Sequence, residues 1–583
     1  MDKWDLTPLY PSFDSEEFKT DMSALKSDIT AIETILTEDV SPSDKAEKYI
    51  LAQNRFQDRA ERLIEYAALR TSADTSDSEA EKYLDIIENL LTQTAENETK
   101  FIEFLLAAGD LDNRPVLAEH AFYLDELRRE GKHILSPGEE SVFARMRITG
   151  SGAFNKLWET KSAGLTADVA LPDGAKTLPI AEVRSLAYNP SSAVRKAAYE
   201  AELKALDTIK DEAAFALNSI KGEVITEAGL RRYKSPLDMT LARSRMDENV
   251  LYPMLEAMKD AMPDFRRYFR HKARLLGHNG ALPFYDLFAP VGESSVTFTL
   301  EEAETAVCEC FASFSSDLSY YAKTAFENNW IDIYPRKGKR GGAFCSNLHC
   351  IKQSRFLTNF TGSLNDVITF AHELGHGYHG HMLNNETAIN SHYPMPIAET
   401  ASTFCETIAK NALLAKADDK TKLFILETDI SDSAQIVVDI LSRFLFEDKL
   451  FELRKNGPLT AEEMSDIMLW AQRETYGDGL DEKYLHKYMW VIKPHYYDAE
   501  YNYYNFPYAF GLLFARGLYS VYKKRGSSFA ADYNRLLSVT GKNLLKDAAA
   551  LFDIDVTSKK FWADSIEEIK GDINKFISIS NYR

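Results

Sequence analysis

Apolar residues recur at intervals of three and four along most of the chain. Between residues 15 and 157 nearly every segment shows this spacing, as at Phe18 and Met22, with acidic and basic residues in between. The same spacing returns from residue 191 to 227 and again from 249 to 276. It places the apolar side chains on one face of an α-helix. The pattern therefore predicts a predominantly α-helical protein.

A short alternating stretch interrupts the helical pattern. Residues 165–183 alternate around Pro172-Asp173-Gly174, a turn of the kind that joins two antiparallel strands. We expect a β-hairpin here and place a domain boundary directly after it. The chain then divides into a helical N-terminal domain over residues 1–185 and a second domain over residues 186–583.

A second interruption begins with a basic, glycine-rich turn, Pro335 to Gly342. Two segments follow, residues 343–346 and 355–361, and both are short enough to be strands. The glycines have neither the Walker nor the Rossmann spacing, so we do not expect a phosphate-binding loop. The sequence predicts a small hairpin within a helical protein, and a simple surface loop is the alternative for the turn.

Composition and charge narrow the class of protein. The chain has 583 residues, of which 45% are hydrophobic and 27% charged, close to the average of folded globular proteins. Its formal net charge of −21 argues against a nucleic acid as partner. No apolar stretch has the length of a signal peptide or a membrane span. With only five cysteines, we expect a protein of the reducing cytoplasm, without a membrane partner.

The most informative motif is His372-Glu373-Leu374-Gly375-His376. Upstream of it, Ser363-Leu-Asn-Asp366 resembles a capping box that starts a helix. Residues four apart project from the same helix face, so the two imidazoles can bind one metal ion. Glu373 points beside these ligands and can take a proton from the attacking water. We therefore predict a catalytic metal site rather than a hydrogen-bonded pair of histidines.

A catalytic zinc site needs a third protein ligand. The downstream candidates are Glu386, His392, Glu399 and Glu406. Glu386 and His392 lie in segments that we expect to be loops at the surface. Glu399 and Glu406 are seven residues apart on a segment that starts at Pro396, so they share one face of a second helix. Their neighbours are small or apolar, which favours Glu399 as the third ligand and Glu406 as the acid that orients a ligating histidine.

Together these motifs resemble the M3 family of zinc metallopeptidases, and within it oligoendopeptidase F. The resemblance extends over almost the whole chain. It is carried by His372-Glu-Leu-Gly-His376, Glu399-Thr-Ala-Ser402, Trp4-Asp-Leu-Thr-Pro-Leu-Tyr10, Leu275-Leu-Gly277, Gly338-Lys-Arg-Gly-Gly342-Ala-Phe, Asn359-Phe-Thr-Gly362 and Lys493-Pro-His495-Tyr.

The resemblance implies a fold and a chemistry. The expected fold is a predominantly α, two-lobed zincin-type metallopeptidase with a small β-hairpin beside a deep central channel. One Zn²⁺ per chain is the expected cofactor, and oligopeptides are the expected substrates. The sequence leaves the oligomeric state open.

One part of the sequence departs from the family pattern. Members that resemble oligoendopeptidase F have a Tyr-x-Tyr-x-Tyr run after the Pro-His pair, whereas this chain has Phe506 in the middle position. The resemblance implies that His495 and one tyrosine stabilise the oxyanion. We favour Tyr508 for that role, with Tyr504 as the alternative.

The sequence therefore predicts a zinc-dependent endopeptidase that hydrolyses internal bonds of short oligopeptides. His372, His376 and Glu399 hold the ion and Glu373 is the general base. Residues Gly341, Gly342 and Ala343 are expected to present a free strand edge to the substrate backbone. Two alternatives remain: an exopeptidase of the dipeptidyl carboxypeptidase type on the same scaffold, and a non-catalytic peptide-binding protein that contains zinc.

Overall fold

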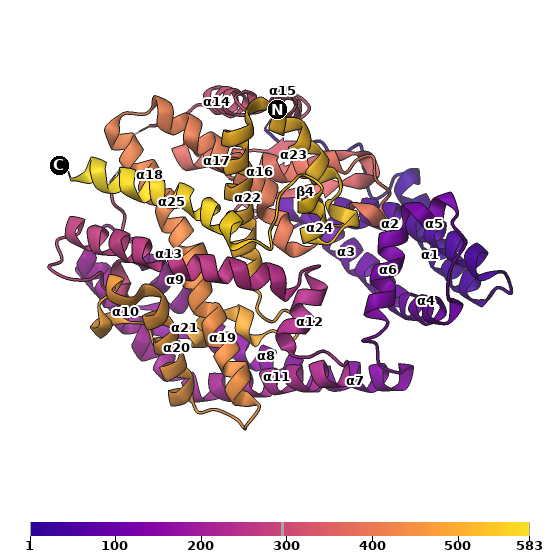
Figure 1. Ribbon diagram of the computed structural model, residues 1–583, viewed down its shortest axis with the longest axis horizontal. Coiled ribbons are helices and arrows are strands. Elements are labelled where there is room, and N and C mark those ends of the chain that lie inside the picture. Colours follow the sequence, from indigo (N-terminus) through magenta and orange to yellow (C-terminus); the bar gives the residue numbers. More distant parts are fainter. Residues whose placement is uncertain (1, 293–295, 582–583) are drawn as a thin grey trace. The chain divides into compact units, whose positions relative to one another are not determined.

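The computed structural model describes residues 2–292 and 296–581. Helices dominate it, and strands are few and short (Figure 1), which confirms the predicted α-helical class. The chain divides into two compact units that each draw on three separate stretches of sequence. The predicted boundary at residue 185 divides the chain into two consecutive sequence domains, which is a different division from these compact units, and it stays a prediction.

Unit 1 comprises residues 1–133, 296–415 and 521–554. Its helices and strands are α1 (Glu16–Thr37), α2 (Pro42–Ala73), α3 (Ser78–Leu91), α4 (Ala95–Ala108), α5 (Pro115–Glu119), α6 (Ala121–Glu130), α14 (Leu300–Ala312), α15 (Ser316–Glu327), β3 (Ile331–Asp332), β4 (Phe344–Leu348), β5 (Gln353–Leu357), α16 (Leu364–Met382), α17 (Met395–Lys416), α23 (Phe529–Ser538) and α24 (Leu545–Ala550).

Unit 2 comprises residues 134–295, 416–520 and 555–583, and the division between the units falls within α22 (Phe506–Arg525). Its other elements are α7 (Pro137–Thr149), α8 (Ser151–Ala163), β1 (Thr166–Leu171), β2 (Gly174–Pro179), α9 (Ile180–Ser185), α10 (Ser192–Asp207), α11 (Lys210–Leu230), α12 (Pro236–Arg243), α13 (Glu248–Leu275), α18 (Asp419–Ala434), α19 (Ile440–Arg454), α20 (Ala461–Tyr476), α21 (Met489–Ile492) and α25 (Lys559–Ser580).

The N-terminal helices of unit 1 support the small sheet. Helix α2 packs between α1 and α3 and also against β4. Two of its acids reach the hairpin: Glu65 accepts a hydrogen bond from the Ser346 hydroxyl (2.6 Å) and Glu61 accepts one from the Cys350 backbone N–H (2.7 Å). Burial raises the pKa of both carboxyl groups. The N-terminal region therefore holds the strand on which the sequence predicts substrate binding.

The small sheet of unit 1 has the order β3-β5-β4. Strands β4 and β5 pair antiparallel, which confirms the predicted hairpin, and β4 lies at one edge of the sheet. The second strand begins two residues earlier than the sequence predicts, because the connection is a single 3₁₀ turn that ends at Lys352 with φ of +56°. The left-handed region is unusual for a lysine, so no residue type in this segment indicates the turn.

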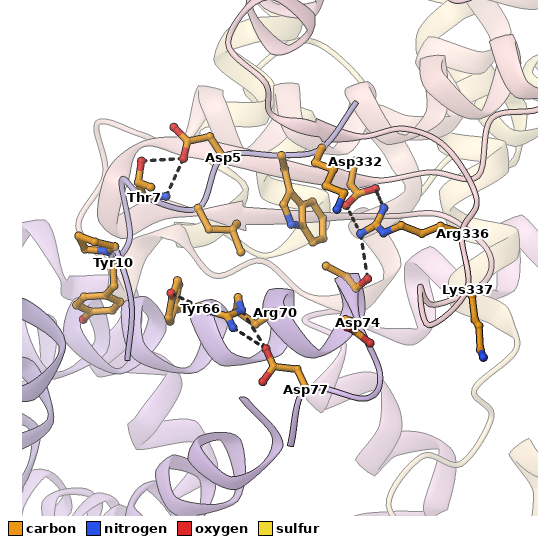
Figure 2. Close-up of a pocket in the computed structure, with 15 residues that line it drawn as sticks. Asp5, Thr7, Tyr10, Tyr66, Arg70, Asp74, Asp77, Asp332, Arg336 and Lys337 are labelled. Carbon is orange, nitrogen blue, oxygen red and sulfur yellow. Dashed lines mark hydrogen bonds and ion pairs between the residues drawn. The ribbon is translucent and has the colours of Figure 1, made fainter. Parts of the chain in front are cut away.

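The basic turn between β3 and β4 docks on the end of α2, beside a pocket whose lining includes Asp74, Asp332 and Arg336 (Figure 2). The Gly338 carbonyl accepts a hydrogen bond from the Thr75 N–H (2.7 Å), and the Ser72 carbonyl accepts one from the Arg340 N–H (3.0 Å). Lys339 is buried, where its ammonium pairs with the Asp332 carboxylate (2.7 Å) and donates to three backbone carbonyls. Lys339 and the backbone contacts of Gly338 and Arg340 therefore hold this loop in place.

Unit 2 is built around long helices. Helix α25 packs against α13 and α18, α8 packs against α11, and α19 packs against α20. The predicted hairpin is present as β1 and β2, which pair antiparallel and pack on α10. Between α18 and α19 the helix widens into one π-helical turn, η6 (Gln435–Asp439). Within the described residues, no helix combines the length and the apolar character needed to cross a bilayer.

Candidate functional site

Helix α16 presents the metal-binding motif. It begins after Ser363, whose hydroxyl accepts a hydrogen bond from the Asp366 N–H (3.2 Å), while the Asp366 carboxylate accepts one from the Ser363 N–H (2.9 Å). This reciprocal pair is the predicted capping box. The apolar face of the helix, including Val367 and Leu374, is buried. The opposite face therefore carries His372 and His376 in the direction of helix α17.

Gly375 allows the second helix to come close. A Cβ atom at this position would lie 2.7 Å from both the Ala401 carbonyl oxygen and the Ser402 Cα. Because such contacts are shorter than any real Cβ contact, a side chain at Gly375 would force α16 and α17 apart. The glycine within the motif thus brings the acids of α17 within reach of the two histidines.

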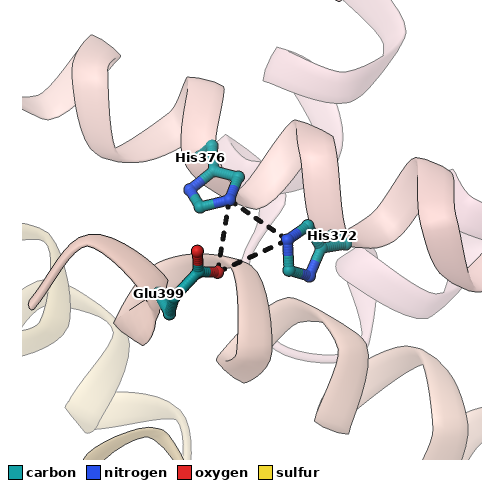
Figure 3. Close-up of side chains that lie close together, drawn as sticks. All are labelled: His372, His376 and Glu399. Carbon is teal, nitrogen blue, oxygen red and sulfur yellow. Dashed lines mark hydrogen bonds and ion pairs between the residues drawn. The ribbon is translucent and has the colours of Figure 1, made fainter. Parts of the chain in front are cut away.

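Three side chains from these two helices converge (Figure 3). The Nε2 atoms of His372 and His376 are 3.1 Å apart, and the Glu399 Oε2 atom lies 3.5 Å from the first and 3.4 Å from the second. All three ligand atoms lie within 4.8 Å of one another. Among the described residues, this is the group of histidine, cysteine and acidic side chains with the geometry to hold a metal ion.

Two further residues orient these ligands. His372 Nδ1 is 2.9 Å from Glu406 Oε1, and the Ser402 hydroxyl donates to Glu399 Oε2 (2.9 Å). With its Nδ1 proton donated to Glu406, His372 turns the lone pair of Nε2 toward the centre of the cluster. Ser402 lies one turn after Glu399 on α17 and fixes the carboxylate in the same way.

The electrostatics of the cluster suit a cation. Burial by itself lowers the pKa of His372, but the hydrogen bond with Glu406 and the nearby acids raise that pKa to about 9. Burial by itself raises the pKa of Glu399, but His376, His372 and Ser402 bring that pKa down to about 2. The group therefore carries negative carboxylates that attract positive charge, which a bound metal ion supplies in place of protons.

Glu373 lies beside the ligands and is buried, with 6% of its surface exposed. Burial raises the pKa of its carboxyl group, and the neighbouring His372 and His376 oppose the rise. A carboxylate of raised basicity next to a metal site is suited to accept a proton. The arrangement can therefore support hydrolysis of a bound carbonyl compound.

The hairpin lies against the same helix. Asn347 of β4 donates a hydrogen bond to the His376 carbonyl (3.1 Å), and a Cβ at Gly380 would collide with the Asn347 side chain. Just before β4, Gly342 has φ of +79°, and its carbonyl accepts a hydrogen bond from Asn359 (2.8 Å). Sequence reasoning missed Asn347, because only the fold brings this strand residue to the helix.

The residues predicted to stabilise the oxyanion belong to unit 2. The rings of His495 and Tyr504 stack at 5.4 Å between centroids, and Tyr504 meets Tyr508 edge to face at 5.8 Å. Burial, Arg443 and Lys493 lower the pKa of His495. Phe506, which stands in place of the middle tyrosine of the expected Tyr-x-Tyr-x-Tyr run, is fully buried, whereas Tyr504 and Tyr508 are half-buried. The departure from the family pattern therefore falls on a core position.

The other sequence candidates lie apart from the cluster. Glu386 forms an ion pair with Lys542 (2.6 Å), and His392 is exposed. His379 is buried, stacks on Tyr393 at 4.0 Å and hydrogen-bonds Thr540. Burial lowers the pKa of His379 to about 3. Not every histidine in the crowded stretch after residue 371 thus contributes to a metal site.

Comparison with known proteins identifies related chains. The model of peptidase family M3 matches residues 185–568, and a model described as oligopeptidase F matches residues 110–166. Oligopeptidase PepF of Bacillus subtilis is 26% identical over 580 residues, covering 96% of this chain and 84% of its own length. An oligoendopeptidase F homolog of Lactococcus lactis subsp. lactis is 27% identical over 530 residues, covering 88% of this chain and 86% of its own length.

Solved structures share the fold. The crystal structure of a putative peptidase from Chlamydophila abortus has a TM-score of 0.86 at 22% identity and covers 99% of this chain and 98% of its own. The crystal structure of oligoendopeptidase-F from Enterococcus faecium has a TM-score of 0.71 at 18% identity and covers 97% of this chain and 99% of its own. The architecture of this chain is therefore one that experiment has already shown for its structural relatives.

Proposed function

The chain belongs to peptidase family M3 and is a metallopeptidase that cleaves oligopeptides, and we propose that it is a zinc endopeptidase whose ion is held by His372, His376 and Glu399. The observation that supports this most directly is the convergence of three ligand atoms from α16 and α17 within 4.8 Å. Two imidazole nitrogens and one carboxylate oxygen are a donor set typical of catalytic zinc, which keeps a fourth position open. The residues present therefore fit one Zn²⁺ per chain.

The protein supplies a base beside the ion. Zinc held in this site would polarise the scissile carbonyl group and lower the pKa of the attacking water. Glu373 accepts the proton of that water and passes it to the leaving amine. The buried position of Glu373 suits the first of these steps, because burial raises the affinity of its carboxylate for a proton.

Glu406 and Ser402 fix the geometry of the ligands. Glu406 Oε1 accepts a hydrogen bond from His372 Nδ1, 2.9 Å away, so that Nε2 stays unprotonated and directed at the ion. Ser402 holds one oxygen of Glu399. We further propose that His495 and Tyr508, with Tyr504 as the alternative, donate hydrogen bonds to the oxyanion.

The edge strand β4 offers a binding mode for the peptide. It pairs on one side with β5 and packs on α16 through Asn347. An extended peptide added along β4 would gain backbone hydrogen bonds without regard to its sequence. Gly341, Gly342 and Ala343 directly precede this strand and would lie beside the same peptide. Glycine at two of these positions leaves room for a second backbone, since a Cβ at either meets no atom of the chain within 4 Å.

The cysteines suggest where the enzyme works. None of the five cysteines, all of which the structure describes, forms a disulfide, and Cys310 and Cys405 are buried. Burial raises the pKa of Cys405, which keeps that thiol protonated and inert. We therefore propose a reducing compartment, the cytoplasm, in keeping with five cysteines that form no disulfide.

Cleavage-site mapping tests the proposed function. Purified protein is incubated with internally quenched peptides of roughly ten residues, a length set by the reach of an extended strand, and the products are identified by mass spectrometry. We expect cuts at internal bonds, loss of activity with 1,10-phenanthroline and recovery with Zn²⁺. Release of terminal dipeptides alone would show an exopeptidase, and stoichiometric zinc without any cleavage would show a binding protein.

A further inference from the structure

A cavity lies within unit 2. It has a volume of about 460 Å³ and is lined by residues of α9, α10, the 3₁₀ turn η3 (Phe284–Asp286), the π-helical turn η6 and Lys493. This size is within the range of small-molecule sites. Its lining includes none of the residues to which the sequence assigns a role.

Aromatic rings form much of the wall. Tyr199 and Tyr285 lie 5.8 Å apart between ring centroids, and Tyr188 lies 5.1 Å from Phe288. Tyr188 is 63% exposed although it belongs to this wall. Rings that line a cavity and are accessible from it favour a ligand with a flat, apolar body.

The charges around the cavity leave one cation without a counterion. Arg184 donates to Glu202 (2.6 Å), and Arg443 forms an ion pair with Asp439. The ammonium group of Lys493 has no hydrogen bond and no ion pair with any residue that the structure describes. Arg195 also lines the cavity and pairs with Asp286 (2.8 Å). Counted with their partners, four cations thus face three acids, and the surplus positive charge belongs to Lys493.

Lys493 is expected to lower the stability of the folded state. Burial and then Arg443 lower its pKa to about 8. A desolvated ammonium without a partner destabilises the folded state, so packing alone does not account for its presence. Gln435 and Asp439, at the two ends of the π-helical turn, line the same cavity, and such turns are frequent at functional sites.

We propose that this cavity binds a small carboxylate with an aromatic body, and that Lys493 pairs with the carboxylate. One surplus positive charge matches a monoanion, since Glu202 and Asp439 would repel a second negative charge. The chemistry is shared by free aromatic acids and by the C-terminal residue of a peptide. The proposal does not depend on the metal site, because every lining residue belongs to unit 2.

Binding is measured by isothermal titration calorimetry on the full-length protein with two matched pairs of ligands. The first pair is 3-phenylpropanoate and 3-phenylpropanamide. The second is N-acetyl-Ala-Phe as the free acid and as the C-terminal amide. We expect each acid that fits to bind about tenfold more tightly than its amide, as a charge-assisted hydrogen bond implies. Binding of both acids identifies a site for aromatic carboxylates in general, and binding of the peptide acid alone identifies a site for peptide C-termini.

Two variants show whether Lys493 is the counterion. Lys493→Met should weaken binding of the acid to the level of the amide. Lys487→Met, which removes the same charge from an exposed position six residues earlier, should leave the affinity unchanged. The midpoint of thermal unfolding of Lys493→Met should equal or exceed that of the unmodified protein, because the change removes an unpaired charge from a half-buried position.

The pH dependence gives an independent readout. Lysine is charged below its pKa, so affinity for the acid should hold at pH 6 to 7 and fall as the pH rises beyond about 8. The proposal is overturned if acids and amides bind equally, if no acid binds up to 20 mM, or if Lys493→Met binds the acid as the unmodified protein does. The comparison of acid with amide needs no variant, so it holds even if Lys493→Met fails to fold.

Discussion

Two groups of side chains are held in place by different forces. One is the ligand cluster of unit 1, formed by His372, His376 and Glu399. The other is the His495 group of unit 2, formed by the rings of His495, Tyr504 and Tyr508. In the cluster, charged and polar groups hold one another: Glu406 orients His372, and Ser402 orients Glu399. In the His495 group, contacts between aromatic rings position the side chains. The buried Nδ1 of His495 has no hydrogen-bond partner among the described residues.

This difference predicts how each group responds to change. A hydrogen-bonded cluster of buried charges fails as a unit, because each member left without its partner is penalised. Rings that pack by shape tolerate the loss of a single polar atom more readily. We therefore expect the loss of a metal ligand in the cluster to abolish metal binding, and single changes in the His495 group to give partial effects.

The largest effect is expected for Glu399→Ala. The variant should lose stoichiometric zinc and, with it, peptidase activity, because two imidazoles alone hold the ion weakly. Elemental analysis of the purified protein measures the zinc content. His392→Ala is the matched control. It removes an exposed imidazole that lies apart from the cluster, so this variant should retain zinc. If Glu399→Ala keeps its zinc, Glu406 becomes the candidate for third ligand.

Glu373→Gln should separate chemistry from metal binding. The variant should retain zinc, since its ligands are unchanged, and lose roughly 10²- to 10⁴-fold in kcat, the usual contribution of a general base. The control is Glu301→Gln, an exposed acid in the first turn of α14, which should leave kcat unchanged. Equal activity of Glu373→Gln and the unmodified enzyme would exclude Glu373 as the base.

The tyrosines of unit 2 should give an intermediate loss. Tyr508→Phe should lower kcat by roughly 10²- to 10³-fold with little change in KM, as expected for one oxyanion donor. Tyr501→Phe is the control, because Tyr501 contacts Tyr504 in the same group and is exposed. If Tyr504→Phe shows the larger loss, the alternative assignment is correct.

Glu406→Gln should act through His372 and have a smaller effect. The amide keeps the size of the side chain but weakens the charge-assisted bond to Nδ1, so zinc affinity should fall roughly 10- to 100-fold. A competition titration with a chelator of known affinity measures this change. Unaltered affinity would mean that the 2.9 Å contact does not orient the ligand.

The sequence predicts the cluster better than it predicts the cavity. The four-residue spacing of His372 and His376 and the seven-residue spacing of Glu399 and Glu406 are local features of helices, so periodicity alone indicates which side chains share a face. The start of α16 at Ser363 follows from its capping residues, whereas α17 begins at Met395, one residue before the predicted Pro396.

Contacts between distant segments escape this kind of reasoning. Asn347 reaches α16 only because β4 packs there, and the glycine of the motif is explained only once α17 is seen against it. Likewise, the missing partner of Lys493 depends on how Arg184, Arg443 and their acids pair. No local pattern states which charges of a chain will remain unpaired after folding.

The smallest expected effect tests whether the cavity and the His495 group are electrostatically linked. After burial, the positive charges of Arg443 and Lys493 lower the pKa of His495. Lys493→Met removes one of these charges, which favours the imidazolium form, so the pKa of His495 should rise by a fraction of a unit, the usual scale for a partly screened charge. NMR titration of the histidine ring protons measures the shift, with His495→Gln identifying the resonance. A carboxylate bound to the unmodified protein offsets the same charge and should shift the resonance in the same direction, whereas Lys487→Met should leave it unmoved. An unchanged pKa in Lys493→Met would mean that ring packing and burial alone set the behaviour of His495.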